Sequence, residues 1–178
     1  MPLQILNIDK NITLSIYHFI PRFFLFDWTS RLLDITSIPF FLWVIILIIF
    51  HYRKKSIYFI LLPLFNLLIA GGIANYILKN IFERIRPCIQ DIVISLSCPS
   101  DFSFPSGHAA TSFAAATTIA LLDPKRKILY YSIALIISLS RIYLGVHYLF
   151  DIIGGIILGI SISILSMKIL RINKSYKT

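Results

Sequence analysis

Five stretches without a charged residue divide this chain, and they limit its possible folds more than any other feature. They run over residues 35–52, 56–78, 109–122, 128–140 and 152–167. Hydrophobic residues make up 57% of the 178-residue chain, which is more than a soluble domain of that length would bury. A helix needs about 20 apolar residues to cross the hydrocarbon of a bilayer. We therefore predict an all-α integral membrane bundle of five to six transmembrane helices.

The last three of these stretches are shorter than a membrane span, so their helices must extend into the polar residues beside them. Those polar side chains would then lie near the level of the lipid headgroups. Polar groups at that depth are costly and are usually functional. The residues concerned are Ser106, His108, Arg141, His147 and Asp151.

The N-terminal segment, residues 1–27, mixes apolar side chains with charged ones such as Asp9 and Asp27. This mixture is too polar and too irregular for a secretory signal. We predict an amphipathic helix that lies in the membrane interface and is ended or kinked near Pro21, with a sixth span as the alternative. Residues 28–172 would then form the transmembrane domain.

Basic residues mark one side of the predicted bundle. Residues 51–55, residues 123–127 and the tail from Lys168 hold ten of the seventeen lysines and arginines, and five spans bring all three segments to the same side. An excess of basic residues makes that side cytoplasmic, including a basic tail at residues 173–178. The loop 80–106 would face outward. The net charge of +9 then reflects orientation and contact with anionic lipid, and we expect no binding of nucleic acid.

Several basic residues near the outer ends of the predicted spans go against this rule. They are Lys79, Arg84, Arg86 and Arg141. We expect something anionic to meet them. Lys79, Arg86 and Arg141 would suit a phosphoryl group and its transition state, which need fixed cations. Arg84 and its neighbour Glu83 are instead expected to be solvated or ion-paired at a helix end, with contact between Arg84 and a distal phosphate or headgroup as the alternative.

Two histidines lie where they could take part in chemistry. His147 and Asp151 are four residues apart and are expected on one helix, so their side chains would meet. A carboxylate beside one imidazole nitrogen fixes the tautomer and leaves the other nitrogen as a nucleophile or base. Ser106, Gly107 and His108 open another predicted helix, whose free N–H groups favour an anion. These residue types favour phosphoryl transfer by a histidine nucleophile, and their spacing indicates no metal site.

Three motifs resemble, in order and spacing, the signatures of the type-2 phosphatidic acid phosphatase superfamily. They are Lys79 with Arg86-Pro87 after six residues, Pro105-Ser106-Gly107-His108, and Ser140-Arg141 with His147 after five residues and Asp151 after three more. The resemblance covers residues from about 56 to 170. Each motif alone is weak, whereas the three together are specific.

The resemblance implies a role for each of these residues. His147 would attack phosphorus and form a phosphohistidine, and Asp151 would orient it. His108 would protonate the leaving oxygen and then activate water. The phosphoryl oxygens would be held by Lys79, Arg86, Ser106, Gly107 and Arg141. The resemblance also implies that neither a metal nor another cofactor is needed.

We therefore predict a metal-independent lipid phosphatase of a bacterial inner membrane, with its active site facing the periplasm or exterior. Its partners would be membrane lipids and a lipid phosphate substrate. Undecaprenyl diphosphate is the favoured substrate, with lipid A phosphates and phosphatidylglycerol phosphate as alternatives. A vanadate-dependent haloperoxidase, which shares the anion-binding motifs, and a non-enzymatic lipid carrier are more distant alternatives. The sequence indicates no oligomeric state.

The chain has two cysteines, Cys88 and Cys98, and both fall in the predicted outer loop. An outward-facing compartment permits a disulfide, which would close a short loop over the site. Two free thiols are the alternative.

Overall fold

The computed structural model describes residues 3–35, 37–54, 57–90 and 98–170, and every regular element in these ranges is helical. The all-α prediction is confirmed for this part of the chain. In order, the helices are α1 (Leu3–Phe19), α2 (Phe24–Asp34), α3 (Ser37–Lys54), α4 (Tyr58–Gly72), the π-helix η1 (Ile73–Leu78), α5 (Lys79–Phe82), α6 (Pro87–Gln90), α7 (Gly107–Leu122), the 3₁₀-helix η2 (Pro124–Arg126), α8 (Lys127–Tyr143) and α9 (Leu149–Ile169).

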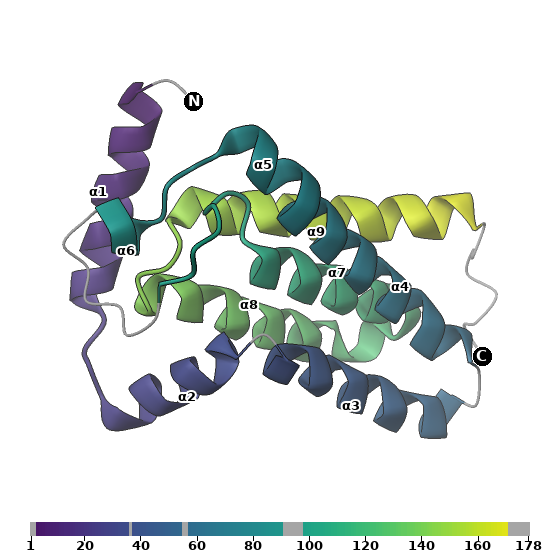
Figure 1. Ribbon diagram of the computed structural model, residues 1–178. Helices are drawn as coiled ribbons and strands as arrows, with labels where there is room; N and C mark the ends of the chain where they lie inside the picture. Colours follow the sequence, from purple (N-terminus) through teal and green to yellow (C-terminus); the bar gives the residue numbers. More distant parts are fainter. Residues whose placement is uncertain (1–2, 36, 55–56, 91–97, 171–178) are drawn as a thin grey trace.

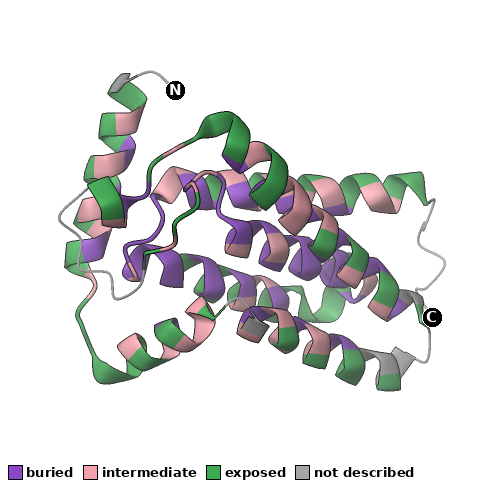
Figure 2. Ribbon diagram, in the orientation of Figure 1, coloured by how far each residue is buried: buried purple, intermediate pink, exposed green. Residues whose placement is uncertain are grey.

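Helix α7 lies at the centre of the bundle, where α4, α8 and α9 pack around it and α3 packs on α4 (Figure 1). Twelve of its sixteen residues are buried, and Figure 2 shows it largely in purple. The sequence explains this position, because the small side chains between Ala109 and Thr118 let three neighbouring helices approach closely.

Two glycines of α9 let this helix pack directly on the backbone of α7. A Cβ atom at Gly155 would lie 2.5 Å from the carbonyl oxygen of Ser106, and one at Gly159 would lie 2.4 Å from that of Ala110. Neither position has room for a side chain, which is the usual reason for a GxxxG spacing in membrane helices. The contact brings together the N-terminal halves of α7 and α9, and both carry predicted site residues.

The number of membrane spans can be compared with the prediction only in the described residues. Within the described residues, two helical segments are long and apolar enough to cross a membrane, Phe59–Gln90 and Leu149–Ile169. A third counts if the helical pair Phe24–Asp34 and Ile38–Ile49, bent by 82°, forms one span. The predicted five to six spans are therefore not confirmed. Helix α7 is one reason, because a helix enclosed by protein needs no long lipid-facing surface.

The N-terminal helices behave partly as the sequence predicts. Helix α1 ends at Phe19 and α2 begins at Phe24, so the chain does break near Pro21. Asp27, where the predicted interfacial segment ends, lies inside α2. Helix α1 also packs against the beginning of α9, as the left side of Figure 1 shows. The interfacial position of residues 1–27 stays a prediction.

The helix ends are grouped as the basic segments of the sequence predict. The end of α3, the start of α4, the turn between α7 and α8 and the end of α9 all lie at one end of the bundle, on the right in Figure 1. Helices α1 and α6 lie at the opposite end, together with the loop that leads into α7. The predicted tail at residues 173–178 falls outside the described residues.

Candidate active site

The predicted site residues come from four parts of the chain and meet at the end of the bundle opposite the basic segments. Five of them line a single cleft of ≈ 560 Å³: Lys79, Arg86, Gly107, His108 and His147. Arg141 lines the same cleft from α8. Ser106 and Asp151 lie just behind its wall, fully buried. The convergence that the motifs predict is therefore present in the fold.

His147 does not lie on the same helix as Asp151, which corrects the prediction. It sits in the turn before α9, and Tyr148, with extended backbone (φ −78°, ψ 163°), caps that helix. The Asp151 carboxylate reaches back to accept a hydrogen bond from the Tyr148 N–H at 2.8 Å. This capping arrangement brings the carboxylate oxygen Oδ2 to 3.4 Å from His147 Nδ1, so the two side chains meet by a different route.

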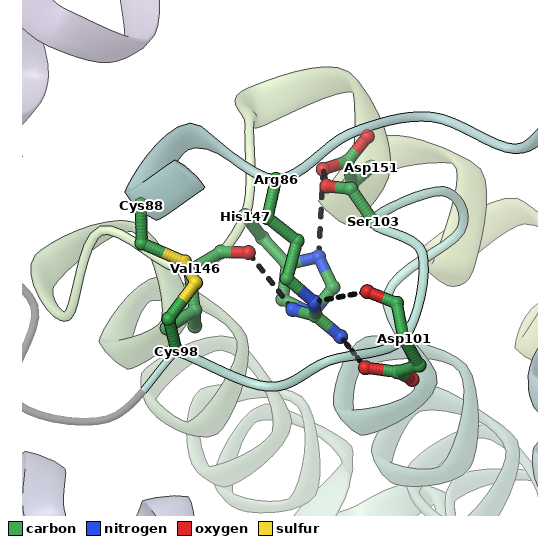
Figure 3. Close-up of a disulfide and its surroundings, with 8 residues drawn as sticks. All are labelled: Arg86, Cys88, Cys98, Asp101, Ser103, Val146, His147 and Asp151. Atoms are coloured by element: carbon green, nitrogen blue, oxygen red, sulfur yellow. Dashed lines mark hydrogen bonds and ion pairs between the residues drawn. A yellow bond between two sulfur atoms is a disulfide. The ribbon is translucent and has the colours of Figure 1, made fainter. Parts of the chain in front are cut away.

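The surroundings of His147 favour a neutral imidazole whose lone pair faces Arg86. Burial lowers the pKa of His147 to about 4, and the positive charges of Arg86 and Lys79 act in the same direction against the Asp151 carboxylate. Asp151 beside Nδ1 keeps the proton on that nitrogen. Nε2 is then the lone-pair nitrogen, and it lies 3.2 Å from Nη1 of Arg86 (Figure 3). A lone pair beside a cation suits attack on a phosphoryl group.

Arg86 and Lys79 share a carboxylate that no motif includes. Arg86 Nη2 donates to Oδ1 of Asp101 at 2.6 Å, and its Nε donates to the Asp101 carbonyl oxygen at 2.9 Å (Figure 3). Lys79 Nζ bonds to Oδ2 of the same carboxylate. Partial burial works to raise the pKa of Asp101, but its bond to Lys79 and the charge of Arg86 outweigh this and hold the pKa below its usual range. Asp101 is therefore an anion bound to two cations at the mouth of the cleft.

Arg141 is paired with a second carboxylate from outside the motifs. Its Nη1 donates to Oδ1 of Asp34 at 2.7 Å, and its Nη2 donates to the carbonyl oxygen of Ser30 at 3.4 Å. Both partners belong to α2. Asp34, and not Asp151, is therefore the carboxylate that pairs with Arg141. Nothing in the sequence pattern marks Asp34, which is one of several acidic residues near the N-terminus.

The start of α7 has the features of an anion site. Ser106 is the N-cap of this helix, and the backbone N–H of Ser106 donates to the carbonyl oxygen of Asp151 at 2.9 Å. A Cβ atom at Gly107 would lie 2.6 Å from Oδ1 of Asn75, so a larger residue would have to displace the Asn75 side chain from the cleft. Among the residues that the structure describes, Nε2 of His108 has no hydrogen-bond partner although it is buried. A buried, unpartnered imidazole nitrogen beside the cleft is available for proton transfer.

The cleft itself has two kinds of wall. Its charged end is formed by the residues described above. Its other wall is apolar and comes from α3 and α4, through Pro39, Phe40, Trp43 and Leu67. Such a cleft suits an amphiphile whose charged group meets the cations and whose apolar part follows the second wall.

Cys88 and Cys98 form a disulfide, with their Cα atoms 5.9 Å apart. Cys88 follows Arg86 by two residues, and Cys98 precedes Asp101 by three. The bridge therefore ties together the two chain segments that carry the Arg86–Asp101 pair, as Figure 3 shows.

Arg84 is ion-paired, as one of the alternatives predicted, but it is not solvated. Its side chain is 10% exposed, and it bridges two fully buried carboxylates. Nη1 lies 2.7 Å from Oδ1 of Asp151, and Nη2 lies 2.7 Å from Oδ2 of Asp9. Asp9 could not be recognised as a site residue from the sequence, since an acidic residue in a partly polar helix carries no motif. The same is true of Ser103, whose hydroxyl bonds to Oδ2 of Asp151.

Residues 60–175 match the sequence model of the PAP2 superfamily. Phosphatidylglycerophosphatase B of Bacillus subtilis (strain 168) is 34% identical over 122 residues, which cover 62% of this chain and 57% of that protein. The undecaprenyl-diphosphatase of Sulfolobus acidocaldarius is 32% identical over 127 residues, which cover 70% of this chain and 60% of that protein. The match thus spans less than two thirds of the length of these curated relatives.

A solved structure resembles the whole described bundle. The crystal structure of a transmembrane PAP2 type phosphatidylglycerolphosphate phosphatase from Bacillus subtilis superposes with a TM-score of 0.77 at 28% identity. The superposition covers 98% of this chain and 90% of that one. The superposition thus extends beyond residues 60–175, which indicates that the N-terminal helices also belong to the shared fold.

Proposed function

This chain belongs to the PAP2 superfamily, and from that membership we propose that it hydrolyses a lipid phosphate or diphosphate in a membrane through a phosphohistidine intermediate. Relatives that carry the name of a phosphatase support the activity. The single observation that carries the proposal is the setting of His147. A carboxylate lies at its Nδ1, and its Nε2 lies at the wall of a cleft that holds three buried cations.

The first half of the proposed reaction moves the phosphoryl group to His147. The lone pair of Nε2 attacks phosphorus while the bond from phosphorus to the leaving oxygen breaks. Lys79, Arg86 and Arg141 stabilise the negative charge that spreads over the phosphoryl oxygens. They would exchange their bonds to Asp101 and Asp34 for bonds to those oxygens. An anion in the cleft favours the protonated form of His108, which gives its proton to the leaving oxygen.

The second half releases phosphate. His108, now neutral, takes a proton from a water molecule, and the water oxygen attacks the phosphohistidine. The bond between phosphorus and Nε2 breaks, His147 returns to its neutral form, and inorganic phosphate leaves with the added oxygen. Asp151 supports both halves, because its carboxylate lies beside Nδ1 and balances the positive charge of the phosphorylated imidazole.

The apolar wall of the cleft supports a lipid substrate, and undecaprenyl diphosphate is our first choice. The two named relatives differ in this respect, since one is named for phosphatidylglycerophosphate and the other for undecaprenyl diphosphate. Phosphatidylglycerol phosphate and lipid A phosphates are therefore the alternatives. The motif residues contact the phosphoryl group, which all these lipids share.

We further propose that the site faces the outside of a bacterial inner membrane, with the C-terminus in the cytoplasm. The grouping of the basic segments at the opposite end of the bundle supports this orientation. Membrane-impermeant thiol reagents added to intact cells should label Cys88 and Cys98 after reduction, whereas a cysteine introduced at Lys125 should react only after the cells are opened. The reverse pattern would contradict the orientation.

Phosphate release from a panel of lipid phosphates tests the proposed activity. Purified protein in detergent, with EDTA present, should release phosphate from undecaprenyl diphosphate and at lower rates from phosphatidylglycerol phosphate and lipid A. The proposal fails if no lipid is hydrolysed, or if EDTA abolishes hydrolysis and magnesium or zinc restores it. Oxidation of bromide by vanadate-loaded protein, without phosphate release, would instead support a haloperoxidase.

A further inference from the structure

We propose that Arg84 is a positioning residue for the nucleophile, and that Asp9 of the N-terminal helix holds Arg84 in place. The inference rests on the proposed function, because it assigns His147 as the group that reacts. Neither Arg84 nor Asp9 touches the cleft that holds the phosphoryl site. They act through Asp151, which is the only contact between the pair and the nucleophile among the described residues.

The contacts form one continuous chain from α1 to His147. Asp9 Oδ2 lies 2.7 Å from Nη2 of Arg84, and Nη1 of Arg84 lies 2.7 Å from Oδ1 of Asp151. The other oxygen of Asp151 then faces His147 Nδ1 at 3.4 Å. Each carboxylate therefore uses one oxygen for Arg84 and keeps the other for a second partner. Rotation of Asp151 away from His147 would break its bond to Arg84.

Asp9 is held as firmly as Arg84. Its Oδ1 accepts the backbone N–H of Phe150 at 3.0 Å, and Thr13, one turn further along α1, accepts the N–H of Leu149 at 2.9 Å. Helix α1 thus caps the first turn of α9, the turn in which Asp151 stands. The guanidinium of Arg84 also lies over the ring of Tyr148, 4.0 Å from its centroid. These contacts leave Arg84 in one position.

Charge makes the arginine necessary. Asp9 and Asp151 are both fully buried, and two desolvated carboxylates repel each other unless a cation lies between them. Arg84 supplies that cation. The other groups around Asp151 are the neutral hydroxyl of Ser103, the N–H of Tyr148, His147 itself, and the more distant cations Lys79 and Arg86, which are bound to Asp101. Without Arg84, one of the two buried carboxylates would take up a proton more readily.

The test compares Arg84→Met with Arg22→Met. Arg22 is a matched control, because its guanidinium also lies over tyrosine rings, at 4.3 Å and 4.2 Å, and pairs with an aspartate of the N-terminal region, Asp27, outside the network. We expect Arg84→Met to lower kcat by about 10- to 100-fold with little change in KM, by analogy with the groups that orient the histidine ligands of metals. The acidic limb of its pH–rate profile should move to higher pH. Arg22→Met should leave both kcat and the acidic limb of the pH–rate profile unchanged.

A double variant separates positioning from folding. Replacing Asp9 as well, in Asp9→Asn/Arg84→Met, removes the repulsion between the carboxylates, so kcat should rise above that of Arg84→Met and the acidic limb should move back. Arg84→Lys keeps the charge but reaches one carboxylate, so its kcat should be intermediate and its acidic limb should match the wild type. If Arg84→Met does not fold, Arg84→Lys is the variant that tests the inference. The inference is wrong if the double variant is no better than the single one, or if Arg84→Lys shifts the limb.

A readout without turnover distinguishes this inference from the proposed function. In the NMR spectrum of protein labelled with ¹⁵N at histidine, His147 should be neutral with its proton on Nδ1, and Arg84→Met should shift its titration midpoint whereas Arg22→Met should not. If wild-type protein hydrolyses no lipid but this shift occurs, the proposed function fails and the network stands. If hydrolysis occurs and the midpoint is the same in Arg84→Met and Arg22→Met, the network has no positioning role.

Discussion

The two halves of the bundle bury polar groups in different ways. At the site end, the cations Lys79, Arg86 and Arg141 are almost fully buried, yet their carboxylate partners are open to solvent. The side chain of Asp101 is 50% exposed and that of Asp34 is 24% exposed. Such partners can leave, and an incoming phosphoryl group can take their place.

The half away from the site contains buried polar groups that are neutral and mutually bonded. Asn66 of α4 donates to Thr118 of α7 at 2.9 Å and to Ser166 of α9 at 2.8 Å. Ser163 of α9 receives a further bond from Thr118 at 3.1 Å. These bonds join three helices without any charge. The difference indicates that buried cations lie where an anion is to be bound, whereas weak neutral bonds are enough to connect these helices.

Replacing the proposed nucleophile gives the largest expected effect at the site end. His147→Ala should abolish release of phosphate from every substrate, because no covalent intermediate can form, while thermal stability changes little. Phosphate release and the melting temperature should be measured together. His18→Ala, at an exposed histidine of α1, is the control and should keep full activity. Turnover by His147→Ala would contradict the role of His147 as the nucleophile.

His108 should matter less where the leaving group needs no proton. General acid catalysis contributes about 10²- to 10⁴-fold, so His108→Ala should lose that much on a lipid monophosphate and less on a nitrophenyl phosphate. With the nitrophenyl ester, stopped-flow measurements should show a burst of nitrophenolate followed by a stall, because water is no longer activated. Equal losses on both substrates and no burst would contradict the role of His108.

Asp101 should behave as a competitor of the substrate anion. Asp101→Asn weakens the contact with Lys79 and Arg86, and a partly exposed ion pair contributes up to about 1 kcal/mol, or about fivefold in affinity. Vanadate should therefore inhibit this variant at a several-fold lower concentration than the wild type. Asp123→Asn, which breaks a pair with Arg126 at the opposite end, should leave inhibition unchanged. Weaker inhibition of Asp101→Asn would mean that Asp101 helps to bind the anion.

The neutral half should show the smallest effect, and only on stability. Asn66→Ala removes two interhelical bonds, each of which contributes about 0.6 kcal/mol in membrane proteins, and it should leave kcat and KM unchanged. Thermal unfolding in detergent measures the loss. Asn80→Ala, at an exposed amide bonded to its own helix, is the control. A large loss of activity in Asn66→Ala would contradict the claim that the neutral half affects only stability.

The motif residues could be predicted from the sequence, because their types and spacings are set by the chemistry of a phosphoryl group. The same holds for the grouping of the basic segments and for the small residues of α7, which follow from the membrane and from close packing. His147 shows the limit of local periodicity. Its spacing from Asp151 predicts a shared helix. Tyr148 is the N-cap of α9, however, so this helix begins at Leu149 and His147 lies before it.

Asp9, Asp34 and Asp101 could not be predicted as partners of the site. Each is at least 15 residues away from the cation that it binds, and pairing over that distance depends on how α1, α2 and the loop before α7 fold back onto the bundle. The number of spans also depends on such packing, since α7 is enclosed by its neighbours. The hydropathy of a helix depends only on its own residues and does not show which other helices pack around it.

The most direct test of the central claim is to identify the residue that carries the phosphoryl group. The protein with His108→Ala should be mixed with nitrophenyl phosphate, quenched at alkaline pH, where phosphohistidine survives, and digested for mass spectrometry. The account predicts one phosphoryl group on the peptide that contains His147, and none when His147→Ala is added to the same protein. A phosphoryl group on another residue, or steady turnover without any phosphorylated peptide, would contradict it.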